Sequence, residues 1–147
     1  MKKLFLAGIV ALAMGFAFVS CNSGSKSDAP VDIKTDGTAV EVMTDIVAKA
    51  KADGANWTVD QWKYVFKQAA IAIKPMMVEL SEATKNVGDM SEEDAAALAE
   101  KFQSYQPIED LMDEFTKIAE STPNGKIVNN DDDFEKQLTE ELGLPDL

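Results

Sequence analysis

The densest group of residues that could bind a metal ion lies near the C-terminus, in a run of two asparagines and three aspartates. Four residues fall at the first, third, fifth and twelfth places of a calcium-binding loop, where oxygen ligands are needed: Asn129, Asp131, Asp133 and Glu140. The sixth place requires a glycine for a sharp turn, and Phe134 stands there. Two interpretations remain. Either Asp131, Asp133 and Glu140 bind calcium, or the aspartates cap and charge the start of a helix, and the missing glycine favours the helix start.

Carboxylates also occur close together on segments with helical spacing, which raises the question of acid–base catalysis. Glu92 precedes Glu93, and Glu109 is followed by Asp110 and Asp113. Two carboxylates hydrolyse a glycosidic bond only when burial raises the pKa of one of them in a cleft that holds a sugar. These acids fall on polar helix faces, where water is the expected neighbour. The sequence therefore predicts a domain that is not an enzyme.

Two residue types that enzymes use often are absent from the whole chain, namely histidine and arginine. Histidine is the commonest general base and transition-metal ligand near neutral pH, and arginine forms paired hydrogen bonds to phosphates and carboxylates. Their absence excludes Ser-His-Asp and Cys-His catalysis and the usual zinc and haem sites. No cofactor is predicted, apart from the calcium considered above.

The aromatic residues have two interpretations. They either line a ligand pocket between proline-kinked helices or pack in the core, and their helical spacing favours the core. Trp57 precedes Thr58, and Trp62 lies four residues after Thr58, which is the spacing of a hydrophobic staple at a helix start. The aromatic residues concerned are Trp57, Trp62, Tyr64, Phe66, Phe102, Tyr105 and Phe115.

The spacing of apolar residues places these side chains on helices. Apolar residues recur at intervals of three and four over residues 38–53, 58–86 and 91–121, as in amphipathic helices. Thr58 with Gln61, and Ser91 with the acids that follow it, are typical helix starts. A last helix follows Asp131 and ends before Gly143. The predicted fold is all-α, an antiparallel bundle of three to four helices with proline kinks, joined by short turns.

The segment 58–86 carries a second apolar stripe beside its main one. Tyr64, Ile71 and Val78 are spaced by seven residues, so they share one face of a helix. A helix that is apolar on two sides is expected to pack between two neighbours.

Prolines interrupt the pattern at several places. Pro75 and Pro107 lie inside long helical segments, where each removes a backbone donor and kinks or breaks the helix. Residues 91–121 therefore form either one kinked helix or two shorter ones. The run Pro123-Asn124-Gly125 is expected to end that segment, and Lys126-Ile127-Val128 is expected to form a short extended piece.

The N-terminus has the pattern of an export signal. Lys2 and Lys3 precede a mostly apolar stretch, and Phe18-Val19-Ser20-Cys21 contains the chain's single cysteine. This run resembles the lipobox of bacterial lipoproteins. The resemblance implies that residues 1–20 are removed and that Cys21 receives a diacylglycerol and an amide-linked acyl chain. The alternatives are an ordinary signal peptide and a membrane helix, although the stretch is short for a span and no basic flank follows it.

The residues after Cys21 indicate which membrane and which face of it the lipoprotein is expected to occupy. Asn22 stands where an aspartate would retain many Gram-negative lipoproteins at the inner membrane, so the resemblance implies an outer-membrane anchor. Surface-exposed lipoproteins of the Bacteroidetes carry clustered acids just after the cysteine. Residues 22–28 contain a single acid, Asp28, which favours the periplasmic face over the cell surface.

Composition and charge limit the partners. Residues 21–37 are predicted to be the lipidated cysteine and a flexible linker rich in serine, glycine and aspartate, and residues 38–147 are predicted to form the helical domain. Removal of residues 1–20 takes away two of 14 basic residues and none of 26 acidic ones, which changes the net charge from −12 to −14. This charge opposes binding to nucleic acid and to anionic lipid and favours cations or basic proteins.

These observations predict a cell-envelope lipoprotein with a noncatalytic, protein-binding or adaptor domain. Its partners are the membrane, through the lipid at Cys21, and another protein. The alternative is a lipoprotein that binds a small ligand or calcium. The acidic, helical composition of this chain is similar to that of helical lipoproteins of the Bacteroidetes, and no motif in residues 22–147 identifies a narrower family.

Overall fold

The computed structural model of the chain describes residues 30–85 and 91–144. In these two ranges the chain forms five α-helices and one short 3₁₀ helix, and it contains no strand. The all-α fold predicted from the sequence is therefore confirmed. The elements are α2 (Ala39–Asp53), η1 (Gly54–Asn56), α3 (Val59–Lys85), α4 (Glu92–Ser121), α5 (Pro123–Asn129) and α6 (Asp132–Leu142).

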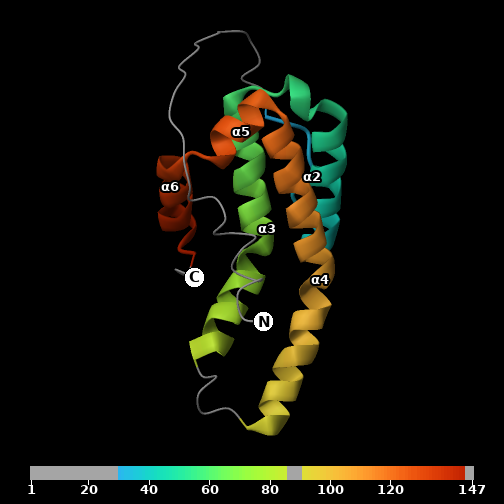
Figure 1. Cartoon of the computed structure of the whole chain (residues 1–147), viewed down its shortest axis with the longest axis vertical. Coiled ribbons are helices and arrows are strands. Elements are labelled where there is room, and N and C mark those ends of the chain that lie inside the picture. Colours follow the sequence, from blue (N-terminus) through green and yellow to red (C-terminus); the bar gives the residue numbers. More distant parts are fainter. Residues whose placement is uncertain (1–29, 86–90, 145–147) are drawn as a thin grey trace.

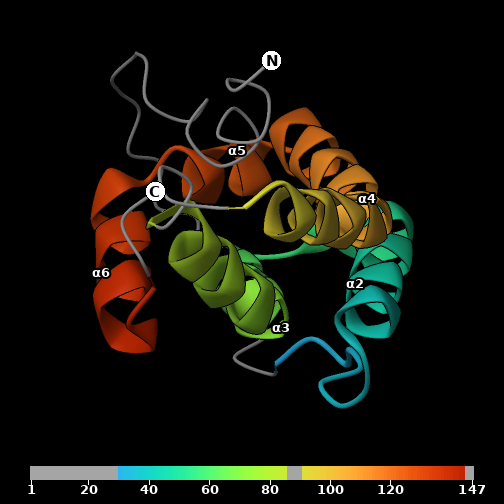
Figure 2. The same cartoon turned by 90° about the horizontal axis from the view of Figure 1, so that it is seen from below.

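The three longest helices form the body of the bundle (Figure 1). Helix α2 packs against α4 and α3, and the short α5 packs against α4 and α3 at one end of the bundle. Helix α6 contacts α3. Figure 2 shows α6 and α2 on opposite sides of α3, so α3 is the central helix of the molecule.

Hydrogen bonds at the helix starts confirm the caps predicted from the sequence. The Thr58 hydroxyl accepts the N–H of Gln61 at 3.2 Å, and the Gln61 side chain accepts the N–H of Thr58 at 2.9 Å. The Ser91 hydroxyl accepts the N–H of Asp94 at 3.1 Å. Each cap satisfies donors that the first helical turn leaves free, so α3 and α4 begin where the sequence places them.

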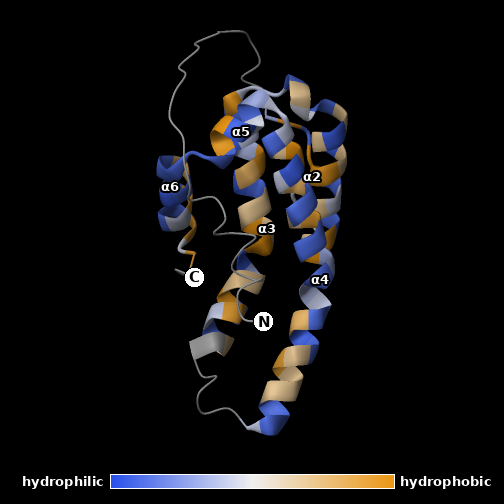
Figure 3. Ribbon diagram, viewed as in Figure 1, coloured by the Kyte–Doolittle hydropathy of each residue, from blue (hydrophilic) through white to orange (hydrophobic). Residues whose placement is uncertain are grey.

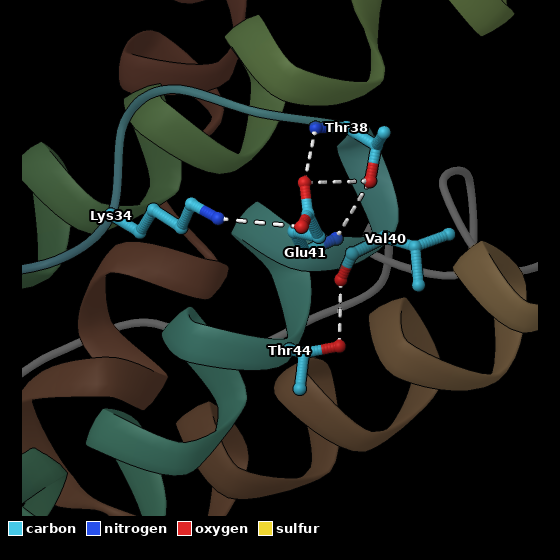
Figure 4. Close-up of polar contacts among 5 residues, drawn as sticks. All are labelled: Lys34, Thr38, Val40, Glu41 and Thr44. Carbon is cyan, nitrogen blue, oxygen red and sulfur yellow. Dashed lines mark hydrogen bonds and ion pairs between the residues drawn. The ribbon is translucent and has the colours of Figure 1, made fainter.

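A third cap begins α2 and is drawn in Figure 4. The Thr38 hydroxyl accepts the N–H of Glu41 at 3.3 Å, and the Glu41 carboxylate accepts the N–H of Thr38 at 2.9 Å. This second bond is the main reason why the pKa of Glu41 lies below its ordinary value, and the Lys34 ammonium at 3.5 Å lowers it further. The capping box thus ties the chain before α2 to the first turn of the helix.

The segment before α2 packs against the helices. Ile33 is buried, with 8% of its surface exposed, and the backbone N–H of Lys34 donates to the Asp45 carboxylate at 2.7 Å. On sequence alone, Ile33 and Lys34 are assigned to the flexible linker. In the structure the packed body extends back to Ile33, which is in the core, and to Val31, which is partly buried against it.

The core is centred on aromatic rings. Trp62 is fully buried, and its ring lies 4.9 Å from Trp57 and 5.8 Å from Phe115, centroid to centroid. The Trp57–Trp62 contact is the predicted staple at the start of α3. Tyr64, Phe66 and Tyr105 are partly buried and pack against the same core. Six of the seven aromatic residues therefore pack in or against the core, as the favoured interpretation predicts. One of the six, Tyr64, also lines a shallow groove between two helices.

Neither internal proline ends its helix. Pro107 lies inside α4, which is continuous from Glu92 to Ser121, so residues 91–121 contain one long helix. Pro75 lies inside α3, and α3 is bent in Figure 1. Both prolines are exposed, and a proline on the outer side of a helix removes one hydrogen bond without placing its ring in the core.

The prediction for residues 123–128 is right in one part and wrong in the other. The helix before Pro123 does end there, because α4 stops at Ser121. The residues that follow form helix α5, not the predicted short extended piece. The hydroxyl of Thr122 accepts the N–H of Gly125 at 3.2 Å, and Pro123 occupies the first helical position, where its missing N–H costs nothing. Val128 is buried with 3% of its surface exposed. The cap at Thr122 and the burial of Val128 together stabilise residues 123–129 as a helix.

The predicted signal peptide, Cys21 and the linker up to residue 29 lie outside the described residues. Within the described residues no helix is both long enough and apolar enough to cross a membrane.

Candidate functional site

The three residues predicted as calcium ligands do not converge in the structure. One oxygen of Asp131 accepts the N–H of Phe134 at 2.9 Å and so caps α6, and the other lies 2.9 Å from the Lys63 ammonium. Asp133 and Glu140 are exposed. In residues 30–85 and 91–144, no three acidic side chains are grouped so that they could hold a metal ion. Asp131 therefore has the capping role that the second interpretation predicts.

The electrostatics of Asp131 follow from these contacts. The hydrogen bond from Lys63 holds the pKa of the Asp131 carboxyl below its ordinary value of 3.8, and the N–H of Phe134 adds to this effect. Partial burial acts in the opposite direction but does not cancel the shift. Asp131 is thus a charged group that fastens the start of α6 to α3.

A shallow groove of about 240 Å³ lies between α3 and α6. Helix α3 contributes Lys63, Tyr64 and Lys67, and Lys67 lies on the same side of the helix as the other two because it follows them by four and three residues. The residues from α6 are Phe134, Gln137, Leu138 and Glu141. The groove contains a single carboxylate, so it lacks the pair of acids that glycoside hydrolysis requires.

Ion pairs hold α6 against α3 at both of its ends. Lys63 pairs with Asp131 before the first turn of α6, and Lys67 pairs with Glu141 in the last turn. The Lys63 ammonium also lies 5.1 Å from the centre of the Phe134 ring. No residue of α6 is fully buried, and its visible face is mostly hydrophilic in Figure 3. Helix α6 is thus attached by charge and by partly buried apolar contacts.

Helix α6 covers only part of the second apolar stripe on α3. Tyr64 lines the groove beneath α6. Two turns further along, Ile71 has 42% of its surface exposed, and Val78 is half-buried. The sequence predicts a neighbour on this side of α3, and α6 supplies one at Tyr64. The stripe continues past α6 as an open apolar surface.

The carboxylates considered for catalysis do not form a paired site in the structure. Glu92 and Glu93 are exposed in the first turn of α4. Glu109 is half-buried, and burial raises its pKa above the ordinary value, with further contributions from Asp110 and Asp113. All three of these last acids lie on one helix, and a row of acids on one helix is not a cleft that can hold a sugar.

A polar cluster between α3 and α4 has no counterpart in the sequence analysis. The Glu79 carboxylate accepts hydrogen bonds from the ammonium of Lys101 and the hydroxyl of Tyr105. The bond to Glu79 is the main cause that raises the pKa of Tyr105 to about 12. Glu79 lies more than twenty residues from either partner, so no spacing rule finds this cluster. It joins the two helices and contains no unpaired group for chemistry.

Comparison with known proteins adds no assignment. No protein-family model, curated protein or solved structure matches the chain at a significant level.

Proposed function

We propose that this protein is a lipid-anchored lipoprotein of the cell envelope whose helical domain binds another protein and catalyses no reaction. One observation carries the proposal. The second apolar stripe of α3 extends beyond α6 to Ile71 and Val78, where no described element packs against it closely enough to bury Ile71. An apolar helix face that remains open beside a covered one is a typical place for a partner to pack.

The absence of catalytic groups supports a binding role. The chain contains no histidine, the groove between α3 and α6 contains a single carboxylate, and Asp131 is engaged by Lys63 and by the start of α6. The alternative expected from the sequence is small-ligand or calcium binding. It has less support because, among the described residues, Asp133 and Glu140 do not join other acidic side chains in a group that could hold a metal ion.

The anchor is proposed from the N-terminal sequence. The lipobox resemblance at Phe18 to Cys21 supports lipidation of Cys21, and Asn22 supports transfer to the outer membrane, with the domain on the periplasmic face. The serine- and glycine-rich composition that follows Cys21 supports a tether between the anchor and the domain.

Two measurements test the two parts of this proposal. Mass spectrometry of the mature protein should show an N-terminus at Cys21 that carries acyl chains, and Cys21→Ala should abolish both the cleavage and the acylation. An unmodified N-terminus at another residue would refute the anchor.

Crosslinking in native envelopes tests the binding part. The wild-type protein should form a crosslinked species with one dominant partner, and Ile71→Glu should reduce its yield. Val40→Glu is the matched control, because Val40 is a β-branched residue of similar exposure, 37% against 42%, on a different helix. Equal yields for the wild type and both variants would show that α3 does not bind the partner.

A further inference from the structure

Helix α6 shows which kind of helix fits the outer side of α3. It presents Phe134 and Leu138, four residues apart, toward the groove that contains Tyr64. Its acidic residues at either end pair with lysines of α3. Within its eleven residues, Asp132 to Leu142, five are acidic and one is a lysine. The helix that covers the first part of the stripe is therefore short, amphipathic and acidic.

The pattern of residues that α6 covers on α3 is repeated seven residues further along the helix. Tyr64 and Lys67 are followed, seven residues later, by Ile71 and Lys74. Seven residues are about two helical turns, so both pairs lie on the same side of the helix. Val78 extends the apolar row by a further seven residues. The stripe therefore consists of repeats of an apolar residue and a lysine, and α6 occupies the first.

Lys74 in the second repeat has a different environment from Lys63 and Lys67. No described acidic residue forms an ion pair with it, whereas Lys63 and Lys67 both pair with α6. The residues three and four places away on α3 are all apolar: Ala70, Ile71, Met77 and Val78. Ala70 and Met77 are buried, Val78 is half-buried and Ile71 is exposed. An ammonium next to the exposed Ile71 side chain favours a partner that brings both a carboxylate and an apolar face.

We infer that the second repeat of α3, formed by Ile71, Lys74 and Val78, is a docking site for an acidic amphipathic helix of a partner protein. This inference rests on the function proposed above and specifies the chemistry of the partner. The net charge of −14 expected for the mature chain, 12 basic against 26 acidic residues, opposes an acidic partner at long range, but α6 is acidic itself and still pairs with α3. Short-range pairing with lysines therefore decides what binds on this side.

The test uses a synthetic peptide as the probe and the full-length mature protein as the receptor. The peptide has about 18 residues, or about five helical turns, with leucines at intervals of three and four and glutamates on both sides of them. The control peptide replaces every glutamate by lysine. Binding is measured by fluorescence anisotropy of the labelled peptide.

We expect the glutamate peptide to bind the wild type and to lose affinity about tenfold in Ile71→Glu and in Lys74→Glu. Val40→Glu should bind it like the wild type. Lys74→Glu should in turn bind the lysine peptide more tightly than the wild type does, because the charge pair is restored with opposite signs. Lys74 is not a core residue, so this variant leaves folding intact even if Ile71→Glu does not.

Four results would overturn the inference. The glutamate peptide fails to bind, or it binds equally to the wild type and to Lys74→Glu. Alternatively, the wild type forms a dimer in sedimentation experiments that Ile71→Glu abolishes, which would assign the surface to a second copy of the chain. Finally, the wild-type protein binds phosphatidylglycerol vesicles through Ile71 and Lys74, which would assign the surface to a lipid. If the peptide fails but crosslinking in envelopes remains sensitive to Ile71→Glu, the inferred partner chemistry is wrong and the proposed function stands.

Discussion

The indole N–H of Trp62 donates a hydrogen bond to the carbonyl oxygen of Gly54 at 3.2 Å, inside the core. The same carbonyl accepts the N–H of Trp57 at 3.2 Å. Trp62 thereby links the turn after α2 to the second turn of α3, and a methyl group on Gly54 would lie 3.1 Å from its ring. Trp62 therefore contributes both apolar packing and a hydrogen bond to the region where α2 ends and α3 begins.

Trp62→Phe should destabilise the protein more than any surface substitution. The phenyl ring leaves part of the indole volume empty and removes the bond to Gly54, which together cost about 2–4 kcal/mol. Urea denaturation followed by circular dichroism measures the free energy of unfolding. Ile71→Ala, at an exposed position on the same helix, should change it by less than about 0.5 kcal/mol. Similar losses for the two variants would contradict the position of Trp62 in the core.

Two glycines should respond to alanine for different reasons. A Cβ on Gly125 would lie 2.6 Å from the backbone oxygen of Ala119 and 2.4 Å from the Thr122 hydroxyl, so α4 and α5 must separate, at about 3 kcal/mol. Gly143 has φ +59° and open space around it, so alanine there costs only the backbone strain, about 1 kcal/mol. Thermal unfolding should show a larger drop in melting temperature for Gly125→Ala than for Gly143→Ala, and the reverse order would refute the packing of α5.

The parts of the fold that the sequence predicted correctly are those set by short-range chemistry. The Thr58–Gln61 cap and the Trp57–Trp62 contact involve residues within five positions of each other, so spacing alone identifies them. Helix α5 was missed because Pro123 and Gly125 are typical of a turn. Its stability comes from contacts with distant residues, such as the bond from the Asn124 amide to the carbonyl of Trp57 at 2.8 Å.

The candidate site was predictable in part. The seven-residue spacing of Tyr64, Ile71 and Val78 predicts an apolar face, but it cannot show that α6 covers Tyr64 and leaves Ile71 exposed. That outcome depends on the length and direction of α6. The pairing of Lys67 with Glu141, 74 residues away in sequence, is likewise a property of the folded chain.

The contribution of Asp131 to the free energy of unfolding should decrease as the pH falls. Its pKa is lowered in the folded state, so the stabilisation is present above the unfolded value of 3.8 and is lost as the pH falls through the lower folded value. Asp131→Asn keeps the cap, because asparagine caps helices well, but it loses the charge pair with Lys63, worth about 0.5–1 kcal/mol. The difference in the free energy of unfolding between the wild type and the variant should begin to shrink near pH 3.8 and should vanish below the lower folded pKa. A difference that stays constant as the pH falls through this range would contradict the assignment.

Calcium should not stabilise the domain. Asp131 is paired with Lys63, and Asp133 and Glu140 do not join it in a metal-binding group, so millimolar calcium should leave the melting temperature unchanged. Magnesium serves as the control for ionic strength. A rise in melting temperature with calcium alone, lost in Asp133→Asn and in Glu140→Gln, would instead establish the calcium site suggested by the spacing of these residues.

Tyr105 should ionise later than an ordinary tyrosine. Its bond to Glu79 favours the protonated phenol and raises its pKa from 10 to about 12. In a Tyr64→Phe background Tyr105 is the chain's only remaining tyrosine, so the ultraviolet absorbance of tyrosinate reports it alone. Adding Glu79→Gln should return the midpoint toward 10. Because the folded pKa is raised, this contribution to stability is complete below pH 10 and is lost as the pH rises through about 12. A midpoint near 10 in the protein with Glu79 intact would show that α3 and α4 are not joined at this point.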